Sequence, residues 1–318
     1  MPYAYDPELA PFVESLPATS LEDLDDLAAA RASIIDLLAP LNASVDLTNI
    51  TVTDHSVPGP DGAPDVPARV YAPDGEVPAG GRPALLDIHG GGFVVGSIEM
   101  EHGFAAQVVR RLGAVVAAVE YRLAPEHPFP AGVEDCYAAL SWLHAHASEL
   151  GVDPDRIAVG GQSAGGGLTA GTVLLARDRG GPPVCFQFLG IPELDHRLDT
   201  PSMRAFVDTP MWHRGNAIKS WQMYLGPDHD GVVSLYASPS IARDLAGLPP
   251  TYLTTMEFDP LRDEGIHYAL RLLEAGVNVE LHSFPGTFHG SGMLPMAEVS
   301  KRASEELLVA LRRGLRVT

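Results

Sequence analysis

The chain has 318 residues, 46% of them hydrophobic, and is therefore long enough to bury a sizeable core. Its net charge of −20, from 21 basic and 41 acidic side chains, argues against partners such as nucleic acids and anionic membrane surfaces. The two cysteines, the lack of a basic-plus-apolar N-terminal signal and the lack of a long apolar run predict a cytoplasmic protein without a disulfide framework.

Residues 1–48 differ from the rest of the chain and predict N-terminal helices. Ser20, followed by acidic residues, is typical of a helix start, because a serine side chain can cap free amides and acidic groups favour that end of the helix dipole. We expect this helix to run toward Pro40. Apolar runs then predict strands at Ile50–Val57 and Ala68–Tyr71.

From residue 83 onward, strand and helix patterns alternate, which predicts a mostly parallel sheet with helices on both faces and an α/β fold. The sequence HGGGFVVGS, His89–Ser97, follows the first buried strand of this region. Consecutive glycines let backbone N–H groups approach a ligand without interference from a Cβ atom. A glycine triplet alone is more typical of a flexible turn. In combination with the next motif, it predicts an oxyanion hole with Gly91 and Gly92 as donors, so we call residues 89–97 the oxyanion loop.

That next motif is IAVGGQSAGGG, Ile157–Gly167, an apolar strand that breaks at glycine and restarts as a helix of small residues. It matches the G-x-S-x-G nucleophile elbow, a sharp turn that exposes one serine hydroxyl above the end of a sheet. We therefore predict Ser163 as the nucleophile and the N–H of Ala164 as the third oxyanion donor.

In proteins with a nucleophile elbow, the acid and then the histidine of the triad follow the serine along the chain. A buried strand beginning at Thr251 ends at Asp259, and the strand after the following helix leads to His289. We expect that helix to pack through Ile266, Ala269, Leu270 and Leu273. Asp195 is the strongest alternative for the acid, but it comes one strand too early. His282 lies inside the last strand, where a packing or solvent-facing role is expected.

These motifs together resemble the bacterial hormone-sensitive-lipase-like esterases of the α/β-hydrolase superfamily. The resemblance rests on motifs that follow the family's order: HGGGF (89–93), YRLAPEHPFPA (121–131), GQSAGG (161–166), DPLRDEG (259–265) and FHG (288–290). Residues 191–217 resemble the branch that contains a bacterial heroin esterase. Gln162 departs from the Asp or Thr that most members carry, which affects expectations about subfamily specificity and leaves the triad intact.

The resemblance implies an α/β-hydrolase core at residues 49–191 and 226–318. It also implies a helical cap made of residues 1–48 and an insertion at 192–225. The implied activity is hydrolysis of carboxylic esters, with short acyl chains preferred, through an acyl-enzyme on Ser163. His289 would act as the general base and Asp259 would orient it. As pocket lining we predict five apolar residues of the oxyanion loop and the insertion: Phe93, Val95, Phe206, Met211 and Trp212.

Three alternatives remain at the level of the sequence. An amidase or a thioesterase uses the same machinery, and a ligand receptor on the hydrolase fold need not be catalytic. Receptors of that kind usually lack a triad residue, whereas this chain retains all three. We expect no cofactor and no metal, a small-molecule ester as the substrate, and a homodimer as one oligomeric state consistent with the family. Cys136 and Cys185 are expected to be core residues.

Overall fold

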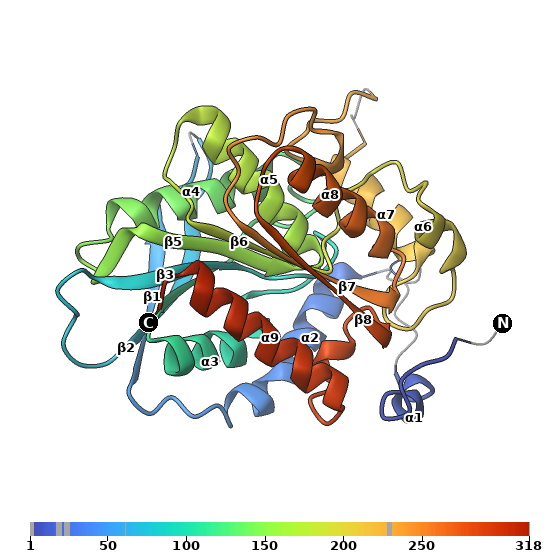
Figure 1. The fold of residues 1–318 in the computed structure, drawn as a ribbon, viewed down its shortest axis with the longest axis horizontal. Coiled ribbons are helices and arrows are strands. Elements are labelled where there is room, and N and C mark those ends of the chain that lie inside the picture. Colours follow the sequence, from blue (N-terminus) through green and yellow to red (C-terminus); the bar gives the residue numbers. More distant parts are fainter. Residues whose placement is uncertain (1–2, 17–20, 22–25, 61, 228–230, 318) are drawn as a thin grey trace.

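The computed structural model describes residues 3–16, 21, 26–60, 62–227 and 231–317. Its centre is an eight-stranded sheet in the order β1-β2-β4-β3-β5-β6-β7-β8 (Figure 1). The first strand pairs antiparallel with the second and the second with β4, and the other neighbours are parallel. The bounds are β1 Ile50–Val57, β2 Val66–Pro73, β3 Arg82–Ile88, β4 Val115–Val119, β5 Val152–Gln162, β6 Phe186–Gly190, β7 Thr251–Phe258 and β8 Val279–Phe288. The predicted mostly parallel sheet is confirmed.

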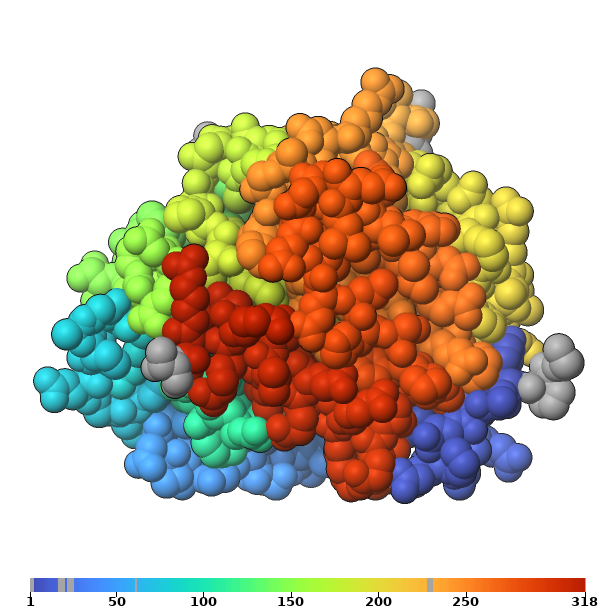
Figure 2. All heavy atoms as spheres, viewed as in Figure 1, coloured from blue at the N-terminus to red at the C-terminus, as the bar shows by residue number. Residues whose placement is uncertain are grey.

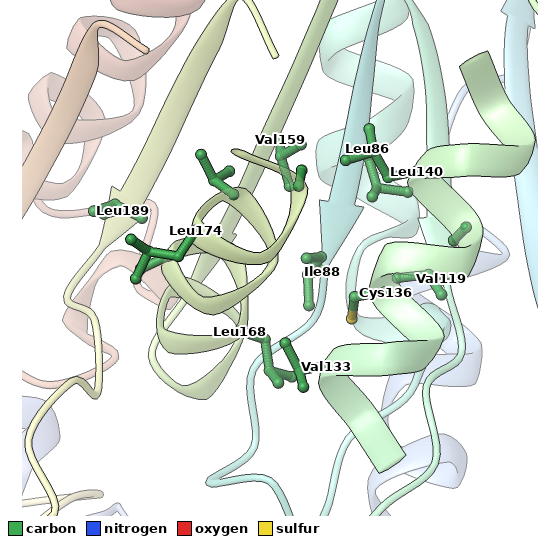
Figure 3. Packing of buried hydrophobic residues seen from close by; sticks show 14 of the residues in the cluster. Leu86, Ile88, Val119, Val133, Cys136, Leu140, Val159, Leu168, Leu174 and Leu189 are labelled. Carbon is green, nitrogen blue, oxygen red and sulfur yellow. The ribbon is translucent and has the colours of Figure 1, made fainter. Parts of the chain in front are cut away.

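Helices cover both faces of the sheet, because the central strands are apolar on both sides. On one face, α4 (Ala131–Ala145) and α5 (Ala164–Arg179) pack against side chains such as Leu86 and Val159 (Figure 3), and α8 (Arg262–Glu274) packs against β7. On the other face, α3 (His102–Leu112) and α9 (Glu298–Gly314) pack against their neighbours along the strands, Leu85 and Ala158. The C-terminal third of the chain covers much of the face shown in Figure 2.

The buried face of α8 matches the prediction only in part: Ala269 is buried as predicted, whereas the two leucines are not. Leu270 and Leu273 are 50% and 52% exposed, whereas Tyr268 and Leu272 are buried. A Cβ atom at Gly265 would lie 3.0 Å from a methyl group of Thr255, so the glycine sets how closely the helix can approach β7. The helix therefore turns its glycine and tyrosine toward the sheet, and the pattern of leucines alone does not reveal this.

Three further helices lie outside the two layers that sandwich the sheet: α2 (Leu27–Asn42), α6 (Pro201–Ala205) and α7 (Arg214–Leu225). The predicted start at Ser20 lies outside the described residues. In the described part, α2 begins after Asp26, whose carboxylate accepts the Ala29 N–H at 3.0 Å. The helix continues through Pro40 and ends at Asn42.

Polar contacts hold α2 in place, since none of its residues is buried. The Arg31 guanidinium donates to the carbonyl of Val94 at 2.8 Å and to both carboxylate oxygens of Glu126 at 2.8 Å. One helix is thereby tied to two loops at the same edge of the sheet. The remaining short elements are α1 (Ala10–Val13), η1 (Ile98–Met100), η2 (Pro239–Ile241) and η3 (Ser291–Met293).

Both cysteines are free thiols. Cys136 is buried on α4, as predicted for a core residue. Cys185 is partly exposed and precedes β6 instead of lying within it, so its assignment to the core was only partly correct. No helix in the described part of the chain is long and apolar enough to cross a membrane.

A buried ion pair fixes the start of α4 to the segment after β4. Asp135 is fully buried, and its carboxylate accepts the backbone N–H of Arg122 at 2.9 Å and two guanidinium hydrogens at 2.8 and 2.7 Å. The neighbouring residue Glu134 makes a bidentate pair with Arg179 in which the arginine is 42% exposed. The two pairs have similar geometry and differ in their access to water.

We expect Arg122→Ala to lower the free energy of unfolding by about 3 kcal/mol, because it leaves a buried carboxylate without its counter-ion. Arg179→Ala serves as the matched control and should change it by less than about 1 kcal/mol, because water screens that pair. Urea unfolding followed by circular dichroism measures both. Equal losses in the two variants would contradict the distinction.

Candidate active site

The nucleophile elbow lies between β5 and α5, where Ser163 adopts φ 58° and ψ −124°. A positive φ is strained for a residue with a side chain, so the surrounding structure must hold it. The Ser163 N–H donates to the Gly190 carbonyl at 2.7 Å. Its carbonyl accepts the N–H groups of Gly167 at 3.0 Å and Glu193 at 3.1 Å. Three backbone hydrogen bonds thus fix the turn on both sides of the serine.

Glycine is required around the serine because the end of β3 passes very close. A Cβ atom at Gly161 would lie 2.3 Å from the carbonyl oxygen of Ile88, and one at Gly165 would lie 2.0 Å from the same oxygen. At Gly166, a Cβ atom would lie 3.0 Å from the Cβ of Pro192. The turn therefore has no room for side chains at these three positions.

The structure brings together the three side chains predicted as a triad. The Nε2 atom of His289 lies 2.9 Å from the Ser163 hydroxyl oxygen, and its Nδ1 atom lies 2.8 Å from a carboxylate oxygen of Asp259. The second Asp259 oxygen accepts the N–H of Leu261 at 2.9 Å. Because the carboxylate can only accept, Nδ1 carries the ring proton and Nε2 is free to accept the serine proton.

The alternative acid and base are engaged elsewhere. The Asp195 carboxylate forms a bidentate ion pair with Arg197, at 2.7 and 2.6 Å. His282 lies between Glu280 and Glu306, with its ring nitrogens 2.9 and 2.6 Å from their carboxylate oxygens. These ion pairs give both residues structural roles.

The oxyanion loop lies directly on the elbow. A Cβ atom at Gly90 would lie 3.0 Å from the Gln162 carbonyl oxygen. Gly91 and Gly92 have φ values of 116° and 57°, which residues with side chains rarely adopt. Among the described residues, the N–H groups of Gly91, Gly92 and Ala164 donate to no other group. They are therefore available to an oxygen beside the serine.

Two aromatic residues support this loop. The sequence motifs alone did not reveal this role. The buried His89 ring donates from Nδ1 to the Gly90 carbonyl at 2.8 Å and stacks on Tyr121 with 4.2 Å between ring centroids. The Tyr121 hydroxyl donates to the His89 carbonyl at 3.0 Å. Burial lowers the pKa of His89 to about 4, so the ring is neutral near pH 7. The proline-rich segment that begins at Tyr121 thus supports the loop.

Two of the predicted lining residues stand against the site. The Trp212 ring lies 5.7 Å from the His289 ring between centroids, and its edge is 2.6 Å from the place where a Gly92 Cβ atom would stand. The methyl carbon and the sulfur of Met211 lie 2.9 and 3.0 Å from the place where a Gly290 Cβ atom would stand. Together these two side chains form a wall that runs from the oxyanion loop to the loop that carries His289.

The other three lining candidates are placed differently. Phe93 is 2% exposed and stacks on Tyr224 at 4.0 Å between centroids, so we reassign it from pocket lining to packing. Phe206 joins an aromatic cluster with Tyr3 and Phe258. Val95 is half-buried at the end of the oxyanion loop. The sequence pattern could not tell these apart, because all three are apolar and lie in loops.

Among the residues that the structure describes, no three His, Cys, Asp or Glu side chains are grouped so that they could hold a metal ion.

Comparisons with known proteins agree on the class of fold and activity. Residues 85–293 match the model of a family described as having the alpha/beta hydrolase fold. The carboxylesterase NlhH of Mycobacterium tuberculosis is 39% identical over 316 residues, which is 98% of this chain and 96% of that protein. The structure of a bacterial heroin esterase is 59% identical, with a TM-score of 0.94 and 98% of both chains covered. An esterase from the archaeon Pyrobaculum calidifontis is 34% identical, with a TM-score of 0.88 and 99% of both chains covered.

The close approach of β3 to the elbow predicts a sharp cost for one added methyl group. We expect Gly165→Ala to destabilise the fold by more than about 2 kcal/mol, because its Cβ would meet a backbone oxygen. Gly103→Ala is the matched control: it is also a helical glycine, but its nearest neighbour is a valine methyl group at 4.0 Å. That variant should be neutral or up to about 1 kcal/mol more stable, because alanine favours helices. Thermal unfolding measures both, and a harmless Gly165→Ala would contradict the geometry.

Proposed function

We propose a catalytic mechanism from the premise that the chain belongs to the hormone-sensitive-lipase-like esterases of the α/β-hydrolase superfamily and is a carboxylic ester hydrolase. In this proposal Ser163 is the nucleophile, His289 the general base and Asp259 the residue that orients it. The observation that carries the proposal is the unbroken chain of contacts from serine hydroxyl to imidazole to carboxylate, at 2.9 and 2.8 Å. Such a chain activates an otherwise weak nucleophile.

The first half-reaction forms an acyl-enzyme. The Ser163 oxygen attacks the ester carbonyl carbon while Nε2 of His289 takes the hydroxyl proton. The imidazolium that forms is stabilised by Asp259, which is 1% exposed and so acts with little screening by water. The C–O bond to the alcohol then breaks, and Nε2 returns the proton to the leaving oxygen. In the second half-reaction, water replaces the alcohol and repeats these steps, which releases the acid.

The N–H groups of Gly91, Gly92 and Ala164 stabilise the tetrahedral intermediate in this proposal. The charge that develops on the former carbonyl oxygen needs donors that are already oriented, because reorienting dipoles during the reaction is costly. Two of the three donors come from the oxyanion loop, and the third is the first amide of α5, where the helix dipole also favours negative charge.

For the substrate we propose esters with a short acyl chain and an apolar or aromatic alcohol. The wall formed by Met211 and Trp212 stands beside the donors and the histidine, which favours a small acyl group and a flat apolar partner. The resemblance to a protein named a heroin esterase points the same way. We also propose that the N-terminal helices and the insertion at residues 192–225 form a cap, since Trp212 belongs to that insertion.

Replacing the nucleophile tests the proposal directly. We expect Ser163→Ala to lower turnover of p-nitrophenyl acetate on the order of 10⁶-fold, and Asp259→Ala on the order of 10⁴-fold, as in other triads. Circular dichroism should show both variants folded. A fluorophosphonate probe should label the wild type at Ser163. Unchanged hydrolysis by Ser163→Ala would refute the assignment, and a failure of the wild type to label would favour a non-catalytic receptor.

Shortening the wall should change the acyl preference. We expect Trp212→Ala to raise the kcat/KM ratio of p-nitrophenyl hexanoate to p-nitrophenyl acetate at least tenfold, because even one methylene in a hydrophobic pocket is worth about 1–3 kcal/mol. Phe206→Ala is the control within the same insertion and should leave this ratio nearly unchanged. An unaltered ratio in Trp212→Ala would remove this residue from the pocket.

A further inference from the structure

The Arg31 side chain of α2 reaches the oxyanion loop from the N-terminal part of the chain. Its Nε–H donates to the Val94 carbonyl at 2.8 Å, and Nη2 donates to the Ala124 carbonyl at 2.9 Å. The Glu126 carboxylate accepts from Nη1 and Nη2, both at 2.8 Å. These contacts use four of the five guanidinium hydrogens, so the plane of the guanidinium is fixed.

Together with the loop backbone, these contacts close a ring of hydrogen bonds. The N–H of Ala124 donates to the Phe93 carbonyl at 3.0 Å, while the carbonyl of Ala124 accepts from Arg31. The carbonyls of two consecutive loop residues, Phe93 and Val94, are therefore both held from outside the loop. Such support matters at Phe93, because its φ of 63° is strained for a residue with a side chain.

The position of Val94 determines the direction of one proposed oxyanion donor. The Gly91 carbonyl accepts the N–H groups of Val94 and Val95 at 3.1 and 3.0 Å. In a planar trans peptide the C=O and N–H bonds point in opposite directions. A Gly91 carbonyl that faces Val94 therefore turns the N–H of Gly92 the other way. A shift of Val94 would rotate the peptide that carries this donor.

We propose that Arg31 is a positioning residue that holds Val94, and through it the peptide between Gly91 and Gly92, so that the Gly92 N–H faces the oxyanion. In this account Arg31 acts through the loop backbone. Every residue of α2 is at least partly exposed, so the helix depends on polar contacts of this kind, and its docking becomes a condition for fast turnover. This inference rests on the proposed function, since it concerns a donor assigned there.

The chain offers a matched control arginine near the C-terminal end of α5, far along that helix from the elbow. Arg177 also donates to two backbone carbonyls, those of Asp244 and Ala246, at 3.1 and 3.0 Å. It likewise pairs with a carboxylate, that of Asp178, at 2.7 Å. The side chains of Arg31 and Arg177 are 22% and 24% exposed. Replacement by Met removes the donors and keeps an apolar stem, so both variants should lower the melting temperature by similar amounts.

Only Arg31→Met should slow the reaction. Removing a whole oxyanion donor costs about 10²–10³ in kcat, and a donor that is misdirected but present should cost less. We expect Arg31→Met to lower kcat for p-nitrophenyl acetate about tenfold, and Arg177→Met to leave it within about twofold of wild type. The KM of Arg31→Met should stay within about twofold of wild type, because acylation and deacylation both pass through an oxyanion and slow together.

Binding of a trifluoromethyl ketone separates positioning from a loss of stability. The adduct of this ketone with a serine carries an oxyanion, so its inhibition constant should rise in Arg31→Met by the factor by which kcat falls. The inhibition constant should be unchanged in Arg177→Met. Glu126→Gln, which weakens only the orientation of the guanidinium, should lower kcat by less than Arg31→Met. The double variant of Arg31→Met and Glu126→Gln should be no slower than Arg31→Met.

Wild-type kcat and ketone inhibition in Arg31→Met, or equal losses of kcat in Arg31→Met and Arg177→Met, would overturn the inference. If Arg31→Met does not fold, Arg31→Lys and Arg177→Lys take the same places in the comparison, because an ammonium group cannot hold two carbonyls in one plane as a guanidinium does. Failure of the proposed function would show instead as hydrolysis by Ser163→Ala or as wild type that the fluorophosphonate does not label.

Discussion

The site depends on the close backbone approach between the end of β3 and the nucleophile elbow. Strand β5, which leads into the elbow, is the parallel neighbour of β3, and Ile88 pairs with Gly161 in register. Their carboxyl ends therefore leave the sheet side by side, and the oxyanion loop starts where the elbow turns. The Ile88 carbonyl fills the space that side chains at Gly161 and Gly165 would need. The strained serine and the positive φ of the loop glycines both follow from this contact.

The rest of the site is held to this contact by buried polar groups from distant segments. Asp259 and His289 leave the ends of β7 and β8, so they reach the serine from the far side of β6. His89 and Tyr121 brace the oxyanion loop from one side, and Ser220 braces it from α7. Buried groups of this kind stabilise a fold only when their hydrogen-bonding needs are met. The protonation state of each buried group therefore decides whether its hydrogen bonds can form.

Much of this could be predicted from the sequence, because the decisive signals are local. The elbow, the glycine triplet and the histidine turn each lie within about ten residues, and the alternation of strands and helices places them at one edge of a parallel sheet. The prediction for the inward face of α8 was right for Ala269 and wrong for the two leucines, because Gly265 and Tyr268 also face the sheet and a count of aliphatic residues overlooks both. Phe93 was misplaced because its stacking partner, Tyr224, is far away in the sequence.

The central claim is that the amides of the oxyanion loop and of α5 converge on one oxygen beside Ser163. The most direct measurement is a crystal structure of the enzyme inactivated by a phosphonate ester, whose phosphoryl oxygen stands in for the oxyanion. The account predicts a covalent bond to Ser163 and a phosphoryl oxygen about 2.7–3.1 Å from the nitrogens of Gly91, Gly92 and Ala164. A bound phosphonate whose oxygen faces solvent, with those amides turned away from it, would contradict the account.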